Sequence, residues 1–118
     1  MTGSAEIVLF VYGSLKRGQA NHHELSAARF LCSALTARAF ALRELAGYPA
    51  LVPGDRAIAG ELYQLPARRL SALDAFEGDA YVRRQIELSD GERAIAYLAR
   101  SAETGTPWPF CEWPAPRT

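Results

Sequence analysis

The spacing of apolar and polar residues changes along the chain from strand-like to helix-like, which predicts a mixed fold. The run Ile7-Val8-Leu9-Phe10-Val11 is continuously apolar, as expected for a strand over residues 6–12 that is covered on both faces. Alternation and short apolar runs predict further strands at residues 36–43, 57–65, 81–88 and 92–99. The last two are separated by Ser-Asp-Gly-Glu, which is typical of a hairpin turn.

Two segments have the spacing of amphipathic helices. Asn21 can cap a helix and Glu24 follows three residues later, as in a capping box. The apolar residues that would then share one face are Leu25, Ala28, Leu31 and Cys32. A second helix is predicted after Pro66 and ends at Gly78. Its apolar face comprises Leu70, Leu73 and Phe76.

The remaining segments contain many glycines and prolines. Residues 46–55 are predicted to form a loop, and Gly60 within a strand indicates a bulge or a close backbone approach. The tail, residues 101–118, cannot be a central strand because of its prolines, and should lie extended over the core. Its possible anchors are Trp108, Phe110 and Trp113. The order β-α-β-β-α-β-β predicts an α+β fold, a small mixed or antiparallel barrel flanked by two helices, formed by residues 1–118 as one domain.

Composition excludes several classes of function. The 118 residues include 13 basic and 13 acidic side chains. The chain therefore lacks the excess of positive charge that would predict binding to nucleic acid or to a membrane surface. Cys32 and Cys111 are far apart and form no C-x-x-C pair, so neither a metal site nor dithiol chemistry is expected. No apolar run reaches the roughly 18 residues of a membrane span, and the N-terminus does not resemble a secretory signal. These features predict a cytoplasmic protein.

The turn after the first strand, Tyr12-Gly13-Ser14-Leu15, is the first candidate for chemistry. A phosphate loop would require a lysine after the second glycine, whereas Lys16 precedes Gly18. A carboxylate fits better, because successive backbone N–H groups can form an anion-binding nest, glycine permits close approach, and the serine adds a hydroxyl. An ordinary tight turn with no ligand is the alternative.

Glu77, at the end of the second predicted helix, is the second candidate. The negative end of the helix dipole and an apolar neighbourhood containing Phe76 and Tyr81 would both raise the pKa of this carboxyl. A glutamate with a raised pKa can act as a general base near neutral pH. The alternative is a solvated glutamate at a helix end. Asp74, one turn earlier, is expected on the solvent face.

Two other patterns favour no particular chemistry. His22 and His23 are adjacent and would diverge by about 100° in a helix, so surface or capping roles are expected rather than a shared metal. Ser14 as a nucleophile would need one of these histidines as its base.

In combination, these stretches resemble the γ-glutamylcyclotransferase-like family, and within it the small branch of γ-glutamylamine cyclotransferase and AIG2-like proteins. The similar stretches are VYGSLKRGQANHH, GYPALVPG, GELYQL, LDAFEGDAYVRR and AIAYL, which occur in the family's order over most of residues 7–99. The resemblance implies a small β-barrel with flanking helices and release of 5-oxoproline from a γ-glutamyl compound without a cofactor. The branch has no long insertions of the kind found in glutathione-degrading relatives, so glutathione is the less expected substrate.

The resemblance also implies roles for individual residues. The loop Tyr12–Leu15 would bind the α-carboxylate of the glutamyl group, and Glu77 corresponds to the catalytic glutamate. Tyr81, Arg83 and Tyr97 correspond to further substrate-binding positions of the family. In the implied reaction the α-amine attacks its own δ-carbonyl, and one carboxylate serves as base and then as acid.

Three questions stay open at the level of sequence. The same fold could serve as a non-catalytic module that binds a small carboxylate, because a fold does not determine a function. The leaving group is undetermined, although the GYPAL segment and the aromatic residues of the tail are the expected walls of its pocket. The oligomeric state is also open.

Overall fold

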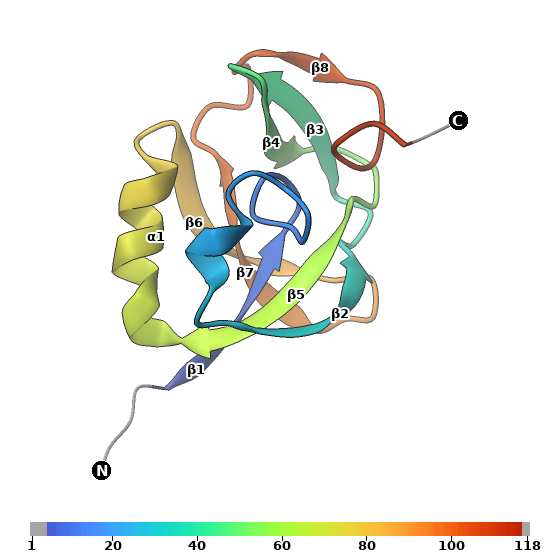
Figure 1. Ribbon diagram of the computed structural model, residues 1–118. Coiled ribbons are helices and arrows are strands. Elements are labelled where there is room, and N and C mark those ends of the chain that lie inside the picture. The colour runs from blue at the N-terminus through green and yellow to red at the C-terminus, as the bar shows by residue number, and fades with distance from the viewer. Residues whose placement is uncertain (1–4, 117–118) are drawn as a thin grey trace.

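The computed structural model describes residues 5–116 (Figure 1). The elements are β1 (Glu6–Val11), the 3-10 helix η1 (His22–Leu25), β2 (Arg29–Leu35), β3 (Phe40–Leu45), β4 (Tyr48–Pro53), β5 (Ala59–Pro66), the 3-10 helix η2 (Ala67–Arg69), α1 (Leu70–Glu77), β6 (Tyr81–Glu87), β7 (Arg93–Ala99) and β8 (Thr106–Trp108). The strands form one mixed sheet that curls into a half-barrel, with α1 alongside it (Figure 1). This arrangement confirms the predicted α+β fold, a small mixed barrel with flanking helices.

The sheet is organised around β7. Strands run in the order β2-β5-β1-β7-β4-β3-β8, and β6 also pairs with β7. Both β1 and β4 are parallel to β7, and they pair with it one after the other along its length. Leu9 of β1 pairs with Ile95, and Leu51 of β4 pairs with Leu98. The edge of β7 therefore passes from one partner to the other near the point where β1 ends.

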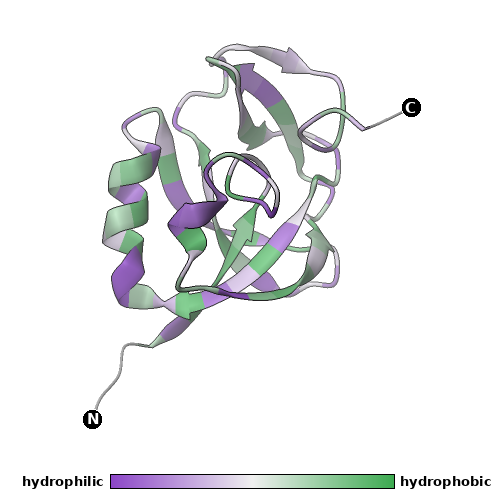
Figure 2. Cartoon of the chain, in the orientation of Figure 1, coloured by the Kyte–Doolittle hydropathy of each residue, from purple (hydrophilic) through white to green (hydrophobic). Residues whose placement is uncertain are grey.

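Strand β1 is buried on both faces, as predicted from its continuous apolar run. Leu9 and Val11 pack in a cluster that includes Leu70 and Leu73 of α1. Phe10 points to the opposite side, into a cluster built from β4, β6 and β7. Figure 2 shows the hydrophobic character of β1 at the centre of the molecule and of β4 above it. Burial on two faces holds this strand in one position, and so determines where the loop after it begins.

Helix α1 confirms the second helical prediction. Leu70 and Leu73 are buried, and Gly78 ends the helix with a φ of 77° while its N–H bonds to the carbonyl of Asp74 at 3.1 Å. Phe76, predicted on the buried face, is instead 38% exposed. It lies in the last turn, where the helix extends past the core.

The first helical prediction is wrong beyond a single 3-10 turn. Residues Arg29–Leu35 form β2, which pairs with β5, and Asn21 makes no side-chain capping bond at η1. The register shifts between Phe30 and Cys32, so Leu31 is displaced as in a β-bulge. This bulge interrupts the period-two alternation and produces the helix-like spacing in the sequence.

The predicted loop over residues 46–55 is also wrong, because Tyr48–Pro53 form β4. Leu45 pairs with Tyr48, which leaves Ala46 and Gly47 as a two-residue turn. Their φ angles, 53° and 86°, are both positive, as in the tight turns that join twisted strands. Alanine is an uncommon residue for such a turn, so the sequence does not predict this hairpin.

Two further boundaries differ from the prediction. The strand predicted over residues 36–43 is broken, since Thr36 forms an isolated bridge to Leu88 and β3 begins only at Phe40. In the tail, β8 pairs with β3 at the end of the sheet, where its proline is tolerated. Trp108 and Trp113 pack on the core as expected anchors, whereas Phe110 is 40% exposed.

Within residues 5–116, no helix has the length and apolar character needed to cross a membrane.

The close approach predicted at Gly60 is confirmed and supports a stability prediction. A Cβ atom at this position would lie 2.4 Å from the carbonyl oxygen of Val11 and 2.5 Å from the ring of Phe10. We expect Gly60→Ala to lower the free energy of unfolding by about 2 kcal/mol, because the buried backbone of β1 must shift. Chemical denaturation would measure the change. Ser33→Ala on the exposed face of β2 is the control and should change stability by less than about 0.5 kcal/mol; equal effects would contradict the prediction.

Candidate active site

A cavity of about 370 Å³ opens where the loop after β1 meets the C-terminal end of α1. The loop, the start of β4, the end of α1, the start of β6 and the middle of β7 all contribute to its wall. The lining residues are Val11, Tyr12, Gly13, Ser14, Leu15, Asn21, Tyr48, Pro49, Phe76, Glu77, Tyr81 and Tyr97. The two candidates identified in the sequence, the glycine turn and Glu77, therefore lie in one cavity.

The turn after β1 presents unused backbone donors on one wall. Lys16 N–H bonds to the carbonyl of Gly13 at 3.0 Å, which closes the turn. Among the residues that the structure describes, the N–H groups of Gly13, Ser14 and Leu15 donate to no protein acceptor. Asn21 Nδ2 donates to Ser14 Oγ at 2.8 Å, so the serine hydroxyl proton stays free. This wall offers hydrogen-bond donors to a ligand.

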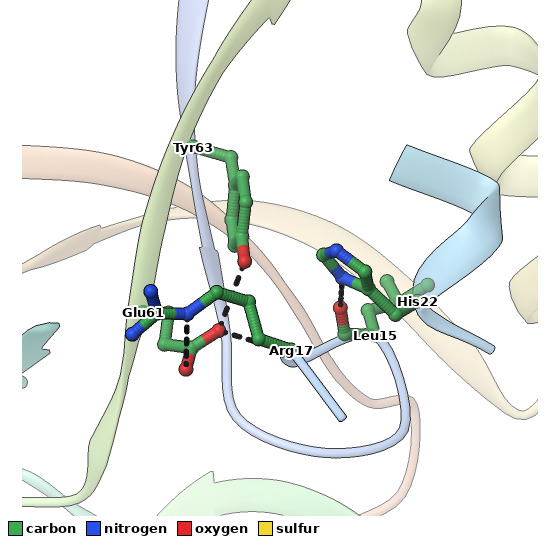
Figure 3. A network of polar contacts seen from close by, with 5 residues as sticks. All are labelled: Leu15, Arg17, His22, Glu61 and Tyr63. Carbon is green, nitrogen blue, oxygen red and sulfur yellow. Dashed lines mark hydrogen bonds and ion pairs between the residues drawn. The ribbon is translucent and has the colours of Figure 1, made fainter. Parts of the chain in front are cut away.

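The same loop is fastened on its other side to β5 (Figure 3). Glu61 accepts hydrogen bonds from the backbone N–H of Arg17 at 2.9 Å and from the hydroxyl of Tyr63 at 3.0 Å. His22 Nδ1 lies 2.9 Å from the carbonyl oxygen of Leu15, and its ring contacts Tyr63. The histidine therefore holds the loop in place. Among residues 5–116, no group of His, Cys, Asp and Glu side chains is arranged to bind a metal.

Gly13 is required by packing rather than by its backbone angles. A Cβ atom there would lie 2.6 Å from Cγ of Pro49, the second residue of β4. The loop and β4 thus touch with no space for a side chain between them. This contact sets the distance between two walls of the cavity.

Glu77 is the last residue of α1 and is half-buried in the wall of the cavity. Burial raises the pKa of its carboxyl to about 7, which confirms the predicted direction of the shift. It is also the only charged side chain among the cavity-lining residues that the structure describes. A carboxyl that is about half ionised at neutral pH can exchange a proton with a bound ligand.

Four tyrosines line the cavity, and three of them, Tyr12, Tyr81 and Tyr97, commit their hydroxyl protons to the protein. Tyr12 donates to the carbonyl of Tyr97 at 2.5 Å and Tyr81 donates to the carbonyl of Pro49 at 2.9 Å. Tyr97 donates to Oδ1 of Asp74 at 2.6 Å. Burial raises the pKa of all three phenols, that of Tyr81 to about 12, so they stay protonated at neutral pH. The oxygens of Tyr81 and Tyr97 can accept hydrogen bonds from a ligand, whereas the oxygen of Tyr12 already accepts one from the N–H of Leu51. None of the three hydroxyls has a proton left to donate.

Arg83 does not line this cavity, in contrast to the other residues predicted for the site. Its guanidinium lies 3.3 Å from Oδ2 of Asp74, and both line a separate depression beyond Tyr97. The cause is the alternation of β6, which places Tyr81 and Arg83 on one face of the strand but two residues apart, one toward the cavity and one past it. Asp74 was expected on the solvent face; its side chain is 42% exposed, yet it bonds to Tyr97.

Sequence reasoning missed some of the cavity wall. Asn21 was assigned to a helix cap, and Phe76 to a buried helix face, whereas both line the cavity. Tyr48 and Pro49 were anticipated as walls through the GYPAL segment, although as a loop rather than a strand. The aromatic residues of the tail do not line the cavity; Trp113 contacts the ring of Tyr48 instead, at 6.3 Å between centroids.

The raised pKa of Glu77 has a measurable effect on stability. The folded chain keeps a proton on this carboxyl up to about pH 7, whereas the unfolded chain releases it near 4.5. Burial of the charge therefore costs stability, and the cost appears as pH rises through this window. We expect Glu77→Gln to be as stable as the wild type below pH 4.5 and about 2 kcal/mol more stable above pH 7, a value reduced for partial exposure.

Denaturation of both proteins across this pH range would measure the difference. Glu103→Gln, at an exposed position, is the matched control and should show no pH-dependent gain. A constant difference between Glu77→Gln and the wild type at all pH values would contradict the burial of Glu77.

Comparison with known proteins places the chain in a family. A family model described as γ-glutamyl cyclotransferase, AIG2-like, matches residues 9–115. The Escherichia coli γ-glutamylcyclotransferase family protein YtfP is 35% identical over 85 residues, which cover 70% of this chain and 74% of that protein. The γ-glutamylaminecyclotransferase C of Danio rerio is 38% identical over 92 residues, covering 68% of this chain and 60% of the relative. A relative from Vibrio cholerae, 37% identical over 70 residues (59% of this chain), is covered over 61% of its length, so the chain spans less than two-thirds of some of its relatives.

Solved structures agree with this placement. An AIG2-like protein from Mus musculus superposes with a TM-score of 0.68 at 29% identity, covering 80% of this chain and 78% of that one. A protein specific to uropathogenic Escherichia coli has a TM-score of 0.77 at 24% identity, covering 82% and 81%, which shows a shared fold. The match over residues 9–115 and the similarity to YtfP together show that the chain belongs to the AIG2-like family of γ-glutamyl cyclotransferases.

Proposed function

We propose that this chain releases 5-oxoproline from a γ-glutamyl amine by attack of the substrate's α-amine on its own δ-carbonyl. The observation that carries the proposal is the meeting, in one cavity, of unused loop N–H groups and a half-buried glutamate whose pKa is about 7. The family and the names of the relatives support the same reaction type. No cofactor is needed, because the substrate contains both the nucleophile and the electrophile.

The donor wall is suited to the α-carboxylate of the glutamyl group. The N–H groups of Gly13, Ser14 and Leu15 supply several donors to one anion without a positive charge. Tyr12 adds the apolar surface of its ring to the same cavity. Holding the carboxylate here would leave the rest of the substrate in the same cavity as Glu77 and the tyrosines.

Glu77 is suited to transfer the proton in both halves of the reaction. Its carboxylate takes a proton from the α-ammonium, whose pKa is near 8 in model peptides, and frees the nitrogen lone pair. The nitrogen forms a bond to the δ-carbon, and the bond from that carbon to the leaving nitrogen breaks. The leaving nitrogen takes this proton from Glu77 as its bond breaks, and the regenerated carboxylate passes the second proton of the attacking nitrogen to the released amine. The products are therefore 5-oxoproline and a protonated amine, and Glu77 is again ionised. Positioning of the two ends of one molecule lowers the barrier by several kcal/mol, out of about 7–11 in ideal cases.

The charge of the cavity favours an amine over an amino acid as the leaving group. Among the lining residues that the structure describes, no lysine, arginine or histidine could pair with a second carboxylate, and Glu77 would repel one. Tyr48 and Phe76, which are 45% and 38% exposed, offer aromatic surface to an uncharged group. These features support a γ-glutamyl amine as substrate rather than a γ-glutamyl amino acid.

The direct test is the release of 5-oxoproline by the wild type and by Glu77→Gln. We expect the substitution to lower kcat by about 100-fold or more, because the amide keeps the size of the side chain but cannot accept the proton. In the wild type, kcat/KM should rise with pH through about 7 as Glu77 ionises, since the base is the deprotonated form. A coupled assay for the product would measure both.

Matched substrates complete this test. γ-Glutamyl phenethylamine and γ-glutamyl phenylalanine differ by one carboxylate, and the first should react faster. Glu103→Gln is again the matched control and should keep wild-type rates. No release from either compound, or wild-type rates for Glu77→Gln, would contradict the proposed function.

Gly13 provides a test of the donor wall. We expect Gly13→Ala to raise KM by about tenfold, because the added methyl group meets Pro49 and separates the loop from β4. Steady-state kinetics would measure KM, with thermal melting to verify the fold. Gly18→Ala, in the same loop but with no atom within 4 Å of its Cβ, is the control and should leave KM unchanged despite some backbone strain at its φ of 81°. An unchanged KM in a folded Gly13→Ala protein would argue against carboxylate binding at this wall.

A further inference from the structure

Asp74 lies outside the cavity and is connected to it through the side chain of Tyr97. Its Oδ1 accepts the hydroxyl proton of Tyr97 at 2.6 Å, and its Oδ2 faces the guanidinium of Arg83 at 3.3 Å. Asp74 itself does not line the cavity, whereas Tyr97 lines both the cavity and the depression on the far side. Any effect of Asp74 on a ligand in the cavity must therefore pass through the phenol.

The contact decides what the phenol can do. A tyrosine hydroxyl has one proton and two lone pairs, and its proton is free to rotate unless an acceptor holds it. Asp74 is an anionic acceptor, and hydrogen bonds of this kind are stronger than those between neutral groups. With its proton held by Asp74, the oxygen of Tyr97 faces the cavity as an acceptor only.

We propose that Asp74 is a positioning residue that holds the Tyr97 hydroxyl so that its oxygen accepts a hydrogen bond from the substrate's α-amine. The inference rests on the proposed function, because it requires the α-amine to lie between Tyr97 and Glu77. Both line the same cavity as the loop that would bind the α-carboxylate.

The role follows from the charge that develops on the attacking nitrogen. After Glu77 removes one proton, the neutral amine attacks the δ-carbonyl and its nitrogen becomes positively charged. An oxygen that can only accept stabilises this charge and directs the remaining N–H away from the carbonyl, which leaves the lone pair in line with it. Without Asp74 the phenol proton could turn into the cavity and oppose the N–H group. The loss would appear in kcat more than in KM.

Two other tyrosines in the cavity strengthen the argument. Tyr12 and Tyr81 donate to the backbone carbonyls of Tyr97 and Pro49, which belong to the sheet itself. Tyr97 is the one cavity tyrosine of the described chain whose proton is held by a side chain. A single substitution can therefore release this proton without altering the backbone.

The experiment is a double-mutant cycle on 5-oxoproline release. We expect Asp74→Ala to lower kcat by about tenfold with KM changed less than about threefold, a loss equivalent to one hydrogen bond. In a Tyr97→Phe background, where the hydroxyl is absent, Asp74→Ala should cost less than about twofold more. A structural role of Asp74 in α1 would instead lower kcat by the same factor in both backgrounds.

Arg83→Gln is the matched control, because it removes the other partner of Asp74 and leaves the bond to Tyr97 in place. It should keep kcat within about twofold of the wild type. Should Asp74→Ala fail to fold, Asp74→Asn retains an accepting oxygen and should keep at least about a third of wild-type kcat.

Three results would overturn the inference: wild-type kcat in Asp74→Ala, equal losses in the two backgrounds, or a loss in Arg83→Gln that matches that in Asp74→Ala. If Asp74→Asn is the variant used, near-complete loss of kcat would do the same. A wild-type chain inactive on every γ-glutamyl compound would instead overturn the proposed function, and the inference with it. An active wild type with an insensitive Asp74 would overturn this inference alone.

Discussion

The hydroxyl of Tyr12 bridges β7 and β4 at the point where β1 ends. It donates to the carbonyl of Tyr97 in β7 and accepts from the N–H of Leu51 in β4 at 3.1 Å. At this point the edge of β7 changes partner from β1 to β4, and the two polar groups would otherwise be buried without partners. The side chain thus replaces part of the backbone ladder, and the chain after it is free to leave the sheet as the loop that lines the cavity.

The cavity is a consequence of this change of strand partner, together with the buried residues around it. Strand β1 fixes the start of the loop, Gly13 against Pro49 fixes its distance from β4, and Glu61 fixes its outer side. Helix α1 brings Glu77 to the same place because Leu70 and Leu73 pack on the cluster that covers β1. The donors and the titratable carboxyl therefore line one cavity that the core holds in place.

Local signals in the sequence predicted those elements whose structure is determined by residues adjacent in the chain. The apolar run of β1, the stop at Gly78 and the hairpin between β6 and β7 each arise from adjacent residues, and so did the two main candidates for the site. The bulge at Leu31 and the turn at Ala46 and Gly47 depend on pairing with distant strands, so β2 and β4 were missed. For the same reason spacing could not show that Asp74 bonds to Tyr97, 23 residues away, or that Arg83 lies outside the cavity.

The three committed phenols give the cavity a polarity that reaches beyond proton transfer. The loop N–H groups offer donors, the oxygens of Tyr81 and Tyr97 offer acceptors, and the aromatic residues Tyr48 and Phe76 give a third, non-polar direction. Three unlike directions that do not lie in one line are the minimum needed to distinguish mirror images. A glutamyl group whose carboxylate, ammonium and side chain each follow one of these directions can bind as only one enantiomer. The directions of the tyrosine protons would therefore help to determine which enantiomer fits the cavity.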